Sequence, residues 1–423
     1  MKPVKGFRDF LPKDWKIQEY IFETWRKVCL SYGFDEYNGP VLEFSSIYNK
    51  SGDDVGTSGK ELYRFEDKRG RDLALRPEMT PTVGRMVAEY GSALPKPIRW
   101  FSIAQFFRAE KPQRGRGREF FQLNADIFGS ESIYSDFEII RLAVDIMLAF
   151  GANEEMFKVK INNRRFTDYF TQKVLGLDKE ESSSFMKVVD ASPKNNRDWF
   201  EKSISEINPT PEFLALVDEY LRIDIADLEK YVEDSEGARE AKRLFKMLKD
   251  ANLSQYCELD TSMARGFDYY TGMVFEVFDM NPNNNRSMFG GGRYDDLLDI
   301  FDKPKVPAVG FAPGDITTKL FLESWGLLPD NLSQQNADIY IPMIEEKSFN
   351  IMQSVADKFR KEGRKVEVGV DVQAIGKAMS YANKAGFSEV IIIGEEELKS
   401  NSYSRKDMKS GEQITEELGG DTL

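Results

Sequence analysis

The sequence contains no histidine among its 423 residues. Without an imidazole there can be no Ser-His-Asp triad, no Cys-His pair and no H-E-x-x-H zinc site. Any catalysis must therefore come from carboxylates, arginine, lysine, hydroxyl groups, backbone amides or a bound cation. The two cysteines, Cys29 and Cys257, are too few for a disulfide framework or a four-cysteine zinc site, and they fit a reducing cytosol.

Long hydrophobic runs are also missing. No apolar stretch approaches the roughly 18 residues of a membrane span, and the first ten residues contain no apolar signal core. We therefore expect a soluble, cytoplasmic protein of about three domains, at roughly 150 residues each. The net charge of −13 argues against a protein coated in nucleic acid, although it allows one local basic patch.

Hydrophobic periodicity predicts many of the helices and strands. An amphipathic pattern indicates a helix over residues 14–32, which Gly33 would end as a C-terminal cap. Interleaved charged and apolar residues predict a helical insertion at about 166–251. Strands are predicted at 35–44, 62–65, 72–75, 98–108, 262–264, 273–278 and 288–290, and helices at 78–90 and 294–301.

The last part of the chain follows a different pattern. Residues 326–336 are polar, contain Pro329 and are typical of a linker. Beyond them, short apolar strands alternate with helices. This alternation predicts a small α/β domain over residues 337–423 with a largely parallel sheet.

Residues 108–118 (RAEKPQRGRGR) are the most informative segment. Glycines make this stretch flexible, and Pro112 keeps it out of a helix. Arginine binds phosphate in a bidentate fork, so the loop suits a polyanion such as a nucleotide triphosphate or an RNA end. Predicted strands on both sides would hold the loop on a rigid sheet. The basic residues of the segment are Arg108, Lys111, Arg114, Arg116 and Arg118.

The strand after this loop has two distinct faces. Residues 121, 123, 125 and 127 form an apolar face typical of a core. The alternate positions carry Phe120, Gln122, Asn124 and Asp126. Gln122 and Asp126 either meet solvent or line a cavity in which a purine stacks on Phe120. Periodicity alone does not decide between the two interpretations.

Two further segments are rich in glycine, arginine and tyrosine. The triplet Gly290–Gly292 is predicted to follow a strand and open a helix, where it would allow a ligand or another backbone to approach closely. It is not a Walker A loop, and the chain has no G-x-G-x-x-G. In residues 265–272 (RGFDYYTG), Arg265 could stabilise a transferring phosphoryl group beside tyrosines, or the segment could be a plain turn between strands.

Together these segments resemble the histidyl-tRNA synthetases, which are class II aminoacyl-tRNA synthetases. The resemblance runs nearly end to end and is weakest in the helical insertion. The R-G-x-D-Y-Y-x-G segment is specific to this branch of the class. The matching pieces are KGFRDFLP, the strand around Pro40, LRPEMTP, FFRAEKPQRGRGREFFQLNADIFG, ARGFDYYTGMVFEV, GGGRYDDLL, PAVGFAPGD and the tail AGFSEVIIIGEEELKSNSYSRKDMKSGEQ.

The resemblance implies an α+β fold: an antiparallel sheet flanked by helices over residues 1–325, a linker at 326–336 and an anticodon-binding α/β domain at 337–423. It implies a homodimer formed around Pro40. It also implies a two-step reaction in which L-histidine and ATP, with Mg²⁺, form histidyl-adenylate, and the histidyl group then passes to tRNA(His). This chemistry needs positioning and charge neutralisation rather than an imidazole from the enzyme, and no metal ligand from the protein.

The resemblance also assigns roles by position. Arg108 and Arg265 would be the catalytic arginines, and both would reach the α-phosphate. Glu110, Arg116 and Phe120 would contact ATP together with Arg108. Lys111, Gln113 and Arg114 would face the tRNA acceptor end. The implied histidine-binding residues are Glu78, Met79, Thr80, Arg108, Gln122, Asp126, Arg265, Tyr269, Tyr270 and Tyr294.

Two positions depart from the family pattern. Phe121 stands where the family usually has histidine, on the face predicted to be core. The usual G-L-E-R reads Gly314–Asp315–Ile316–Thr317 here, so the arginine that normally holds the ATP tail is missing. Either another cation, such as Arg116 or a second Mg²⁺, replaces it, or ATP binding is impaired.

That second departure keeps an alternative function open. The family has a non-catalytic, histidine-binding paralogue, the regulatory subunit of ATP phosphoribosyltransferase, which typically lacks the anticodon domain. A plain RNA-binding module is a third interpretation, but it would leave Glu78 and Arg265 without a purpose. The basic loop, Arg265 and the C-terminal segment favour the synthetase.

Overall fold

The structure is a computed structural model that describes residues 1–50, 53–54, 61–192, 195–263, 270–284, 286–333 and 337–418. The chain forms two compact units, Met1–Leu328 and Pro329–Leu423. No helix in the described part of the chain combines the length and apolarity needed to cross a membrane.

An eight-stranded sheet forms the centre of the first unit, in the order β1-β7-β8-β13-β12-β11-β9-β10. The pairs at its two edges, β1 with β7 and β10 with β9, are parallel, and the inner pairs are antiparallel. The expected α+β fold with an antiparallel sheet is confirmed. The strands are β1 (Asp35–Glu36), β7 (Ile98–Phe107), β8 (Glu119–Phe128), β9 (Phe157–Asn163), β10 (Cys257–Leu259), β11 (Met273–Asp279), β12 (Arg286–Arg293) and β13 (Ala308–Phe311).

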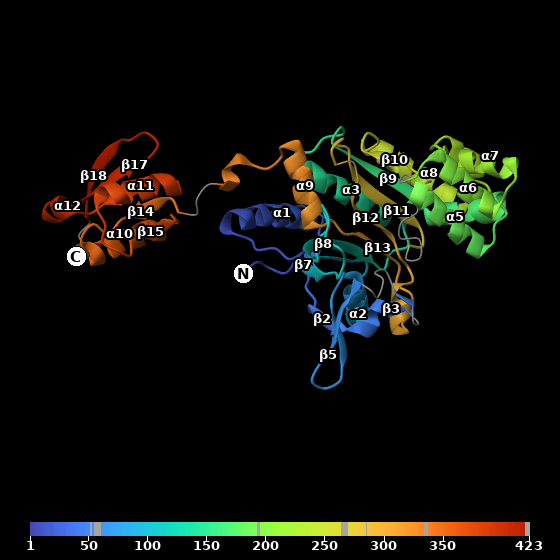
Figure 1. Ribbon diagram of the computed structural model, residues 1–423, viewed down its shortest axis with the longest axis horizontal. Helices are drawn as coiled ribbons and strands as arrows, with labels where there is room; N and C mark the ends of the chain where they lie inside the picture. Colours follow the sequence, from blue (N-terminus) through green and yellow to red (C-terminus); the bar gives the residue numbers. More distant parts are fainter. Residues whose placement is uncertain are drawn as a thin grey trace. The chain divides into compact units, whose positions relative to one another are not determined.

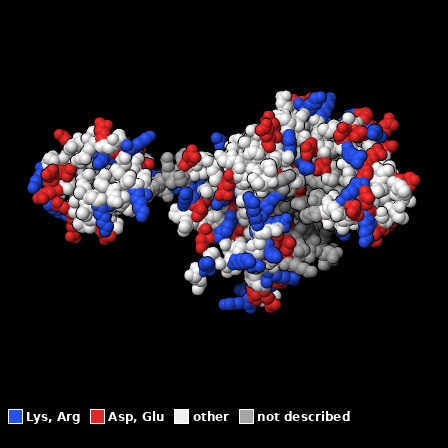
Figure 2. All heavy atoms as spheres, turned by 45° about the horizontal axis from the view of Figure 1, so that its top comes forward, with Lys and Arg blue, Asp and Glu red and all other residues white. Residues whose placement is uncertain are grey.

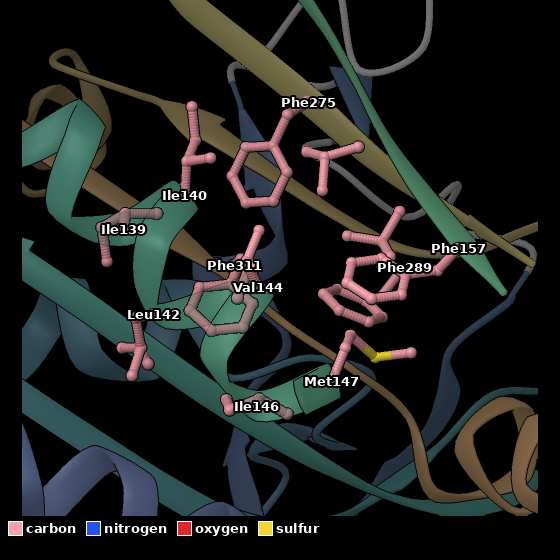
Figure 3. Close-up of a cluster of buried hydrophobic side chains, with 14 of the residues drawn as sticks. Ile139, Ile140, Leu142, Val144, Ile146, Met147, Phe157, Phe275, Phe289 and Phe311 are labelled. Atoms are coloured by element: carbon pink, nitrogen blue, oxygen red, sulfur yellow. The ribbon is translucent and has the colours of Figure 1, made fainter. Parts of the chain in front are cut away.

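Three helices pack on one face of this sheet: α1 (Pro12–Ser31), α3 (Ile133–Ala149) and α9 (Asp315–Trp325) (Figure 1). The core between the layers is apolar. Figure 3 shows Ile140 and Val144 of α3 near Phe275 and Phe311 of the sheet, all of them buried. Residues 123, 125 and 127 of β8 belong to the same core, as their alternation predicts.

The opposite face of the sheet carries α2 (Thr80–Tyr90), whose Val83 and Val87 pack near Phe128. Next to α2 lies a three-stranded sheet of β2 (Leu42–Phe44), β6 (Asp72–Leu75) and β5 (Tyr63–Glu66). The predicted hairpin of β5 and β6 is confirmed, and the carboxylate of Asp67 caps its turn by accepting two backbone N–H bonds. A short pair, β3 (Asn49–Lys50) and β4 (Asp53–Asp54), completes this side.

A helical subdomain follows β9 and has a hydrophobic core of its own, around Phe166, Phe185 and Tyr220. Polar N-caps begin most of its helices, for example Asp178, whose carboxylate completes a capping box with Glu181. Its last helix also contributes Leu244 and Leu248 to the main core. The helices are α4 (Arg164–Tyr169), α5 (Lys179–Ala191), α6 (Arg197–Ile207), α7 (Pro211–Tyr220) and α8 (Glu236–Asp250).

Several local predictions are wrong. The strand predicted at 35–44 is instead two short strands, β1 and β2, separated by residues 37–41. No strand begins at Ser262, because its N–H and hydroxyl both donate to the carboxylate of Asp260 and form a turn; the strand lies earlier, at β10. The glycine triplet lies within β12 rather than opening a helix, and beyond it only a 3₁₀ turn forms at Leu297–Phe301. A Cβ on Gly291 would lie 2.3 Å from the carbonyl oxygen of Gly310 on β13, so glycine permits close packing between strands.

The second unit has a five-stranded sheet in the order β15-β14-β16-β17-β18. The predicted parallel α/β part is present in β14 to β16. The prediction of a largely parallel sheet is wrong for the other half, because β17 and β18 form an antiparallel hairpin. The elements are β14 (Ile339–Ile341), α10 (Phe349–Lys361), β15 (Val366–Val368), α11 (Ile375–Ala385), β16 (Glu389–Ile392), α12 (Glu395–Lys399), β17 (Ser402–Asp407) and β18 (Gln413–Glu417).

Candidate active site

The loop between β7 and β8 forms a small hairpin of its own. The N–H of Gln113 donates to the carbonyl of Arg116 at 3.1 Å, and the reverse bond is 2.9 Å. Gly115 has a φ of +79°, a conformation that strains other residues. At the base of the loop, Nε of Arg118 donates to the carbonyl of Glu110 at 2.9 Å. The flanking strands are those predicted, so the sheet holds both ends of the loop.

An inner cavity of about 320 Å³ lies over the polar face of β8. Gln122 lines it, fixed by a hydrogen bond of 3.1 Å from Nε2 to the carbonyl of Ala312. The polar face of β8 therefore lines a cavity at Gln122 and Asn124, whereas Asp126 is buried and does not line it. The polar side chains of this cavity are Glu78, Thr80, Arg108, Gln122, Asn124, Tyr270 and Glu276.

The inner cavity is acidic. Burial raises the pKa of the Tyr270 hydroxyl, and the neighbouring carboxylates of Glu78, Glu276 and Asp126 raise this pKa further. Tyr270 therefore stays protonated at neutral pH and can both donate and accept a hydrogen bond. A small ligand with an ammonium group or N–H donors fits these charges.

Asp126 and Tyr294 form a buried pair beside this cavity. The Tyr294 hydroxyl donates to Oδ1 of Asp126, whereas Oδ2 is buried with no hydrogen-bond partner among the described residues. Burial raises the pKa of the Asp126 carboxyl to about 7, and the bond from Tyr294 opposes that rise. Gly310 makes room for the carboxylate, since a Cβ there would lie 1.9 Å from Oδ1.

An outer cavity of about 920 Å³ extends from the inner one along the basic loop. Its charged lining comprises Glu61, Arg108, Glu110, Arg114, Arg116, Glu276 and Arg286, and Phe120 supplies an aromatic surface. Glu110 lies between two of the arginines, 3.8 Å from Arg108 and 3.5 Å from Arg116. On the face of the molecule in Figure 2, acidic and basic side chains are interspersed. The arginines make this cavity suitable for phosphates.

Arg108 lies where the two cavities meet. It lines both of them, together with Gln122, Glu276, Gly290 and Ala312. Its Nε donates to the carbonyl of Pro77 at 3.0 Å, and its guanidinium lies 5.1 Å from the centroid of the Phe120 ring. A fixed cation therefore lies between an acidic cavity and a basic one, where a carboxylate in the first would meet a phosphate in the second.

The segment Gly314–Asp315–Ile316–Thr317 begins α9 and borders the outer cavity. Asp315 is fully buried and belongs to the scaffold. Thr317 lines the cavity, but its hydroxyl donates to the carbonyl of Met288 on β12 at 3.1 Å. The position that is usually arginine therefore brings no charge to the outer cavity.

Comparisons with known proteins agree with this architecture. The sequence profile described as Histidyl-tRNA synthetase matches residues 6–314, and the profile described as Anticodon binding domain matches residues 338–419. The histidine–tRNA ligase of Leptospira biflexa is 40% identical and covers 97% of this chain and 94% of the relative. That of Pyrococcus furiosus is 36% identical and covers 97% and 95%. The chain belongs to the histidyl-tRNA synthetase family.

Solved structures show the same fold. The histidyl-tRNA synthetase from Nostoc sp. PCC 7120 has a TM-score of 0.82 at 23% identity, covering 98% of this chain and 96% of that one. A protein from Bacillus halodurans described as an ATP phosphoribosyltransferase regulatory subunit/histidyl-tRNA synthetase has a TM-score of 0.76 at 23% identity, covering 92% and 97%. At these identities the likeness concerns the fold alone.

The structure brings together only part of the site expected for a histidyl-tRNA synthetase. Glu78, Thr80, Gln122 and Tyr270 line the inner cavity with Arg108. Glu110, Gln113, Arg114, Arg116 and Phe120 line the outer one. Lys111 is exposed on the loop beside it. Asp126 and Tyr294 are buried behind the inner cavity, and Met79 packs in the core with Ala104 and Phe106. Arg265 and Tyr269 lie outside the described residues.

Several cavity residues were missing from the site expected from the sequence, among them Asn124, Glu276 and Arg286. Asn124 follows Gln122 at period two, so its place on the polar face of β8 was a usable signal. Glu276 is a lone acid in the apolar strand β11, which is a weaker signal. Arg286 had no signal, because only the folding of β12 against the basic loop brings it into the outer cavity.

Proposed function

We propose that this chain ligates L-histidine to tRNA(His) at the expense of ATP, through a histidyl-adenylate. The observation that carries the proposal is the position of Arg108 between an acidic cavity and a basic cavity. Family membership and the match of both parts of the chain support it. It is compatible with the absence of histidine, because neither step requires an imidazole from the enzyme.

In the first step, a carboxylate oxygen of histidine attacks the α-phosphorus of ATP, and pyrophosphate leaves. Arg108 neutralises charge on the α-phosphate and on the attacking carboxylate, so both reactants are held in line for the displacement. Arg265, the second catalytic arginine in the proposal, would add charge at the same phosphate. In the second step, a hydroxyl of the terminal ribose of tRNA attacks the histidyl carbonyl carbon, and AMP leaves.

Histidine occupies the inner cavity in this proposal. Glu78 and Thr80, at the start of α2, receive the α-ammonium group, with the backbone of Met79 between them. Gln122 and Tyr270 face the imidazole, and Tyr269 would complete this wall. Asp126 and Tyr294 act from behind it. The carboxylates around Tyr270 favour a ligand rich in N–H donors over a neutral apolar side chain.

ATP occupies the outer cavity. The adenine stacks on Phe120, and the phosphates run past Arg108 towards Glu110 and Arg116. Mg²⁺ enters with the nucleotide, where it neutralises phosphate charge. The described residues form no cluster of three or more metal-ligating side chains, so the ATP phosphates would supply most of its ligands. Glu110 and Glu276 are the nearby carboxylates that could complete its coordination.

The tRNA acceptor end meets the tip of the basic loop. Lys111, Gln113 and Arg114 are exposed there, and Gln113 can read a base through its amide. The second unit would bind the anticodon, as its matching profile is described. Because the partner is tRNA, the proposal places the protein in the cytoplasm.

A homodimer is part of the proposal. Four large apolar side chains form an exposed group next to Pro40 and on the neighbouring small sheet. Each is at least 41% exposed, and contiguous exposed apolar side chains mark protein–protein interaction sites: Val41, Leu42, Phe44 and Phe65. A second copy of the chain would cover this surface.

The alternative is a histidine-binding regulatory subunit without catalysis. It is less well supported, because the curated relatives that cover nearly the whole chain are ligases and residues 338–419 match an anticodon-binding domain. Charging decides between the two. Purified protein with labelled histidine, ATP and tRNA(His) should yield acid-precipitable histidyl-tRNA, and Arg108→Ala should abolish it while retaining the wild-type fold. Histidine binding without any charging would favour the regulatory subunit.

A further inference from the structure

Arg286 is a cation of the outer cavity that the proposed function does not yet use. It lies at the start of β12, where the pairing with β11 shifts register between Val277 and Phe278. This shift leaves Met288 as an extra residue, a bulge of the kind that redirects side chains near binding sites. Arg286 thereby lines the outer cavity beside the basic loop rather than continuing the regular sheet.

The contacts of Arg286 leave part of its guanidinium unsatisfied. Nη1 donates to the carbonyl of Arg114 at 2.7 Å, which fixes the group against the loop. Nη2 is buried and has no hydrogen-bond partner among the described residues. Buried donors without acceptors are rare in proteins, and a ligand commonly supplies the acceptor at a binding site.

The loop is shaped to receive this guanidinium. A Cβ on Gly115 would lie 2.0 Å from Nη2 of Arg286, so any larger residue there would displace the group. Burial lowers the pKa of Arg286, and the nearby charges of Arg114 and Arg116 lower it further. Arg116 already has Glu110 as a counter-ion, whereas Arg286 makes no ion pair with a described carboxylate. Asp279 raises the pKa of Arg286 only as the smallest contribution, so the positive charge beside the loop favours a bound anion.

Arg286 also lies close in the structure to the position of the missing arginine. Thr317 lines the same cavity, and its hydroxyl bonds the carbonyl of Met288, two residues beyond Arg286 on the same strand. A cation at position 286 therefore lies on the same wall of the outer cavity as a cation at position 317 would.

We propose that Arg286 binds the β- and γ-phosphates of ATP, and the pyrophosphate that leaves, in place of the arginine absent at position 317. This inference rests on the proposed function, and it assigns the replacement to β12 rather than to Arg116 or a second Mg²⁺. Arg286 is a binding residue for the triphosphate tail. It plays no part in holding the adenylate, which has lost that tail.

The test is Arg286→Met, which keeps an unbranched apolar stem and removes the charged guanidinium. The probes are ATP, in histidine-dependent pyrophosphate exchange, and a non-hydrolysable sulfamoyl analogue of histidyl-adenylate, in equilibrium binding. We expect the KM for ATP to rise about 10- to 100-fold, the effect of losing charge-assisted hydrogen bonds. We expect the affinity for the analogue to stay within about twofold, since the analogue has no β- or γ-phosphate.

Arg222→Met is the matched control, because Arg222 is exposed on the helical subdomain and lines neither cavity. It should leave both quantities unchanged. An equal loss of ATP and analogue affinity in Arg286→Met would show that Arg286 only shapes the loop, and an unchanged KM for ATP would show that another group holds the tail. Either result overturns the inference. Absence of exchange in the unsubstituted protein would instead overturn the proposed function.

Discussion

The guanidinium of Arg8 donates a 2.8 Å hydrogen bond to the fully buried carboxylate of Asp315. The side-chain amide of Gln18 donates to the same oxygen at 2.6 Å, and the backbone N–H of Phe121 donates to the other oxygen at 2.9 Å. One carboxylate at the first residue of α9 thus joins the N-terminal segment, α1 and β8. Asp315 stands where the usual family segment has leucine, so this departure has a structural role.

We expect Asp315→Leu to lower the free energy of unfolding of the first unit by about 3 kcal/mol, because it leaves the buried amide of Gln18 and the half-buried guanidinium of Arg8 without their acceptor. Denaturant unfolding followed by tryptophan fluorescence measures this, since Trp25 is buried in the same unit. Asp9→Ala, at an exposed residue of the same segment, is the control and should change stability by less than about 0.5 kcal/mol. Equal stability of the two variants would contradict the role given to Asp315.

Asp126 should make the stability of the protein depend on pH. Its pKa is raised from the ordinary 3.8 to about 7 in the folded state, so the folded protein binds a proton more tightly than the unfolded chain does. Its stabilising contribution is fully present below pH 3.8 and is lost as the pH rises through 7. The expected slope is about −1.4 kcal/mol per pH unit between those values.

Asp126→Asn removes this titration. The free energy of unfolding of each protein is measured from pH 5 to pH 8. As the pH rises to 7, that of the wild type should fall relative to that of the variant. Other titrating groups are common to both proteins and cancel in the difference. Parallel pH profiles would show that Asp126 keeps an ordinary pKa in the folded protein.

The exposed tip of the basic loop should make a salt-dependent contribution to tRNA binding. Each phosphate contact releases counterions, so removing Lys111 or Arg114 should reduce the slope of log Kd against log salt by about one. Nitrocellulose-filter binding of tRNA(His) from 50 to 300 mM KCl measures the slope. Gln113→Ala is the neutral comparison and should change affinity without changing the slope. A slope that stays the same in Lys111→Ala and Arg114→Ala would place the acceptor end elsewhere.

We expect the exposed aromatic pair on the small sheet to lie in the interface of the proposed homodimer. Phe44 on β2 and Phe65 on β5 are both paired with Leu73 of the strand between them, so they lie on one face. We expect the double substitution Phe44→Glu with Phe65→Glu to convert a dimer into a monomer, because charge would have to be buried at the interface. Sedimentation velocity reports the mass. Ile225→Glu, at another exposed apolar residue, should leave it unchanged. A dimer that survives the double substitution would move the interface away from this sheet.

Local signals predicted the elements whose residues interact with near neighbours in sequence. The helix α1 ends as expected, with Gly33 at a φ of +73°, and the strands around the basic loop are where their alternation indicated. The glycine triplet was misassigned because its reason is not local. Gly290–Gly292 pack closely against β11 and β13, strands that the sequence alone does not align with them.

The candidate site likewise contains residues that local sequence patterns predict and residues that only the folded chain brings in. Alternation placed Phe121 on the helix-covered face of β8, and there it lies half-buried at the edge of the core, with its ring centroid 5.1 Å from that of Phe22 of α1. Arg108, Phe120 and Gln122 could be assigned to a binding face from the loop and strand. Arg286 could not, because its place depends on a bulge in β12 and on the backbone of Gly115, which lies 171 residues before Arg286 in the chain.

Pyrophosphate exchange tests the central claim most directly, because it reports adenylate formation without any tRNA. Purified protein is given labelled pyrophosphate, ATP, Mg²⁺ and one amino acid at a time, with Arg108→Ala and Arg265→Ala as controls. The account predicts label in ATP only when histidine is present, and a loss of at least about 100-fold in each variant. Exchange that another amino acid supports equally well, or no exchange by a protein that binds histidine, would contradict it.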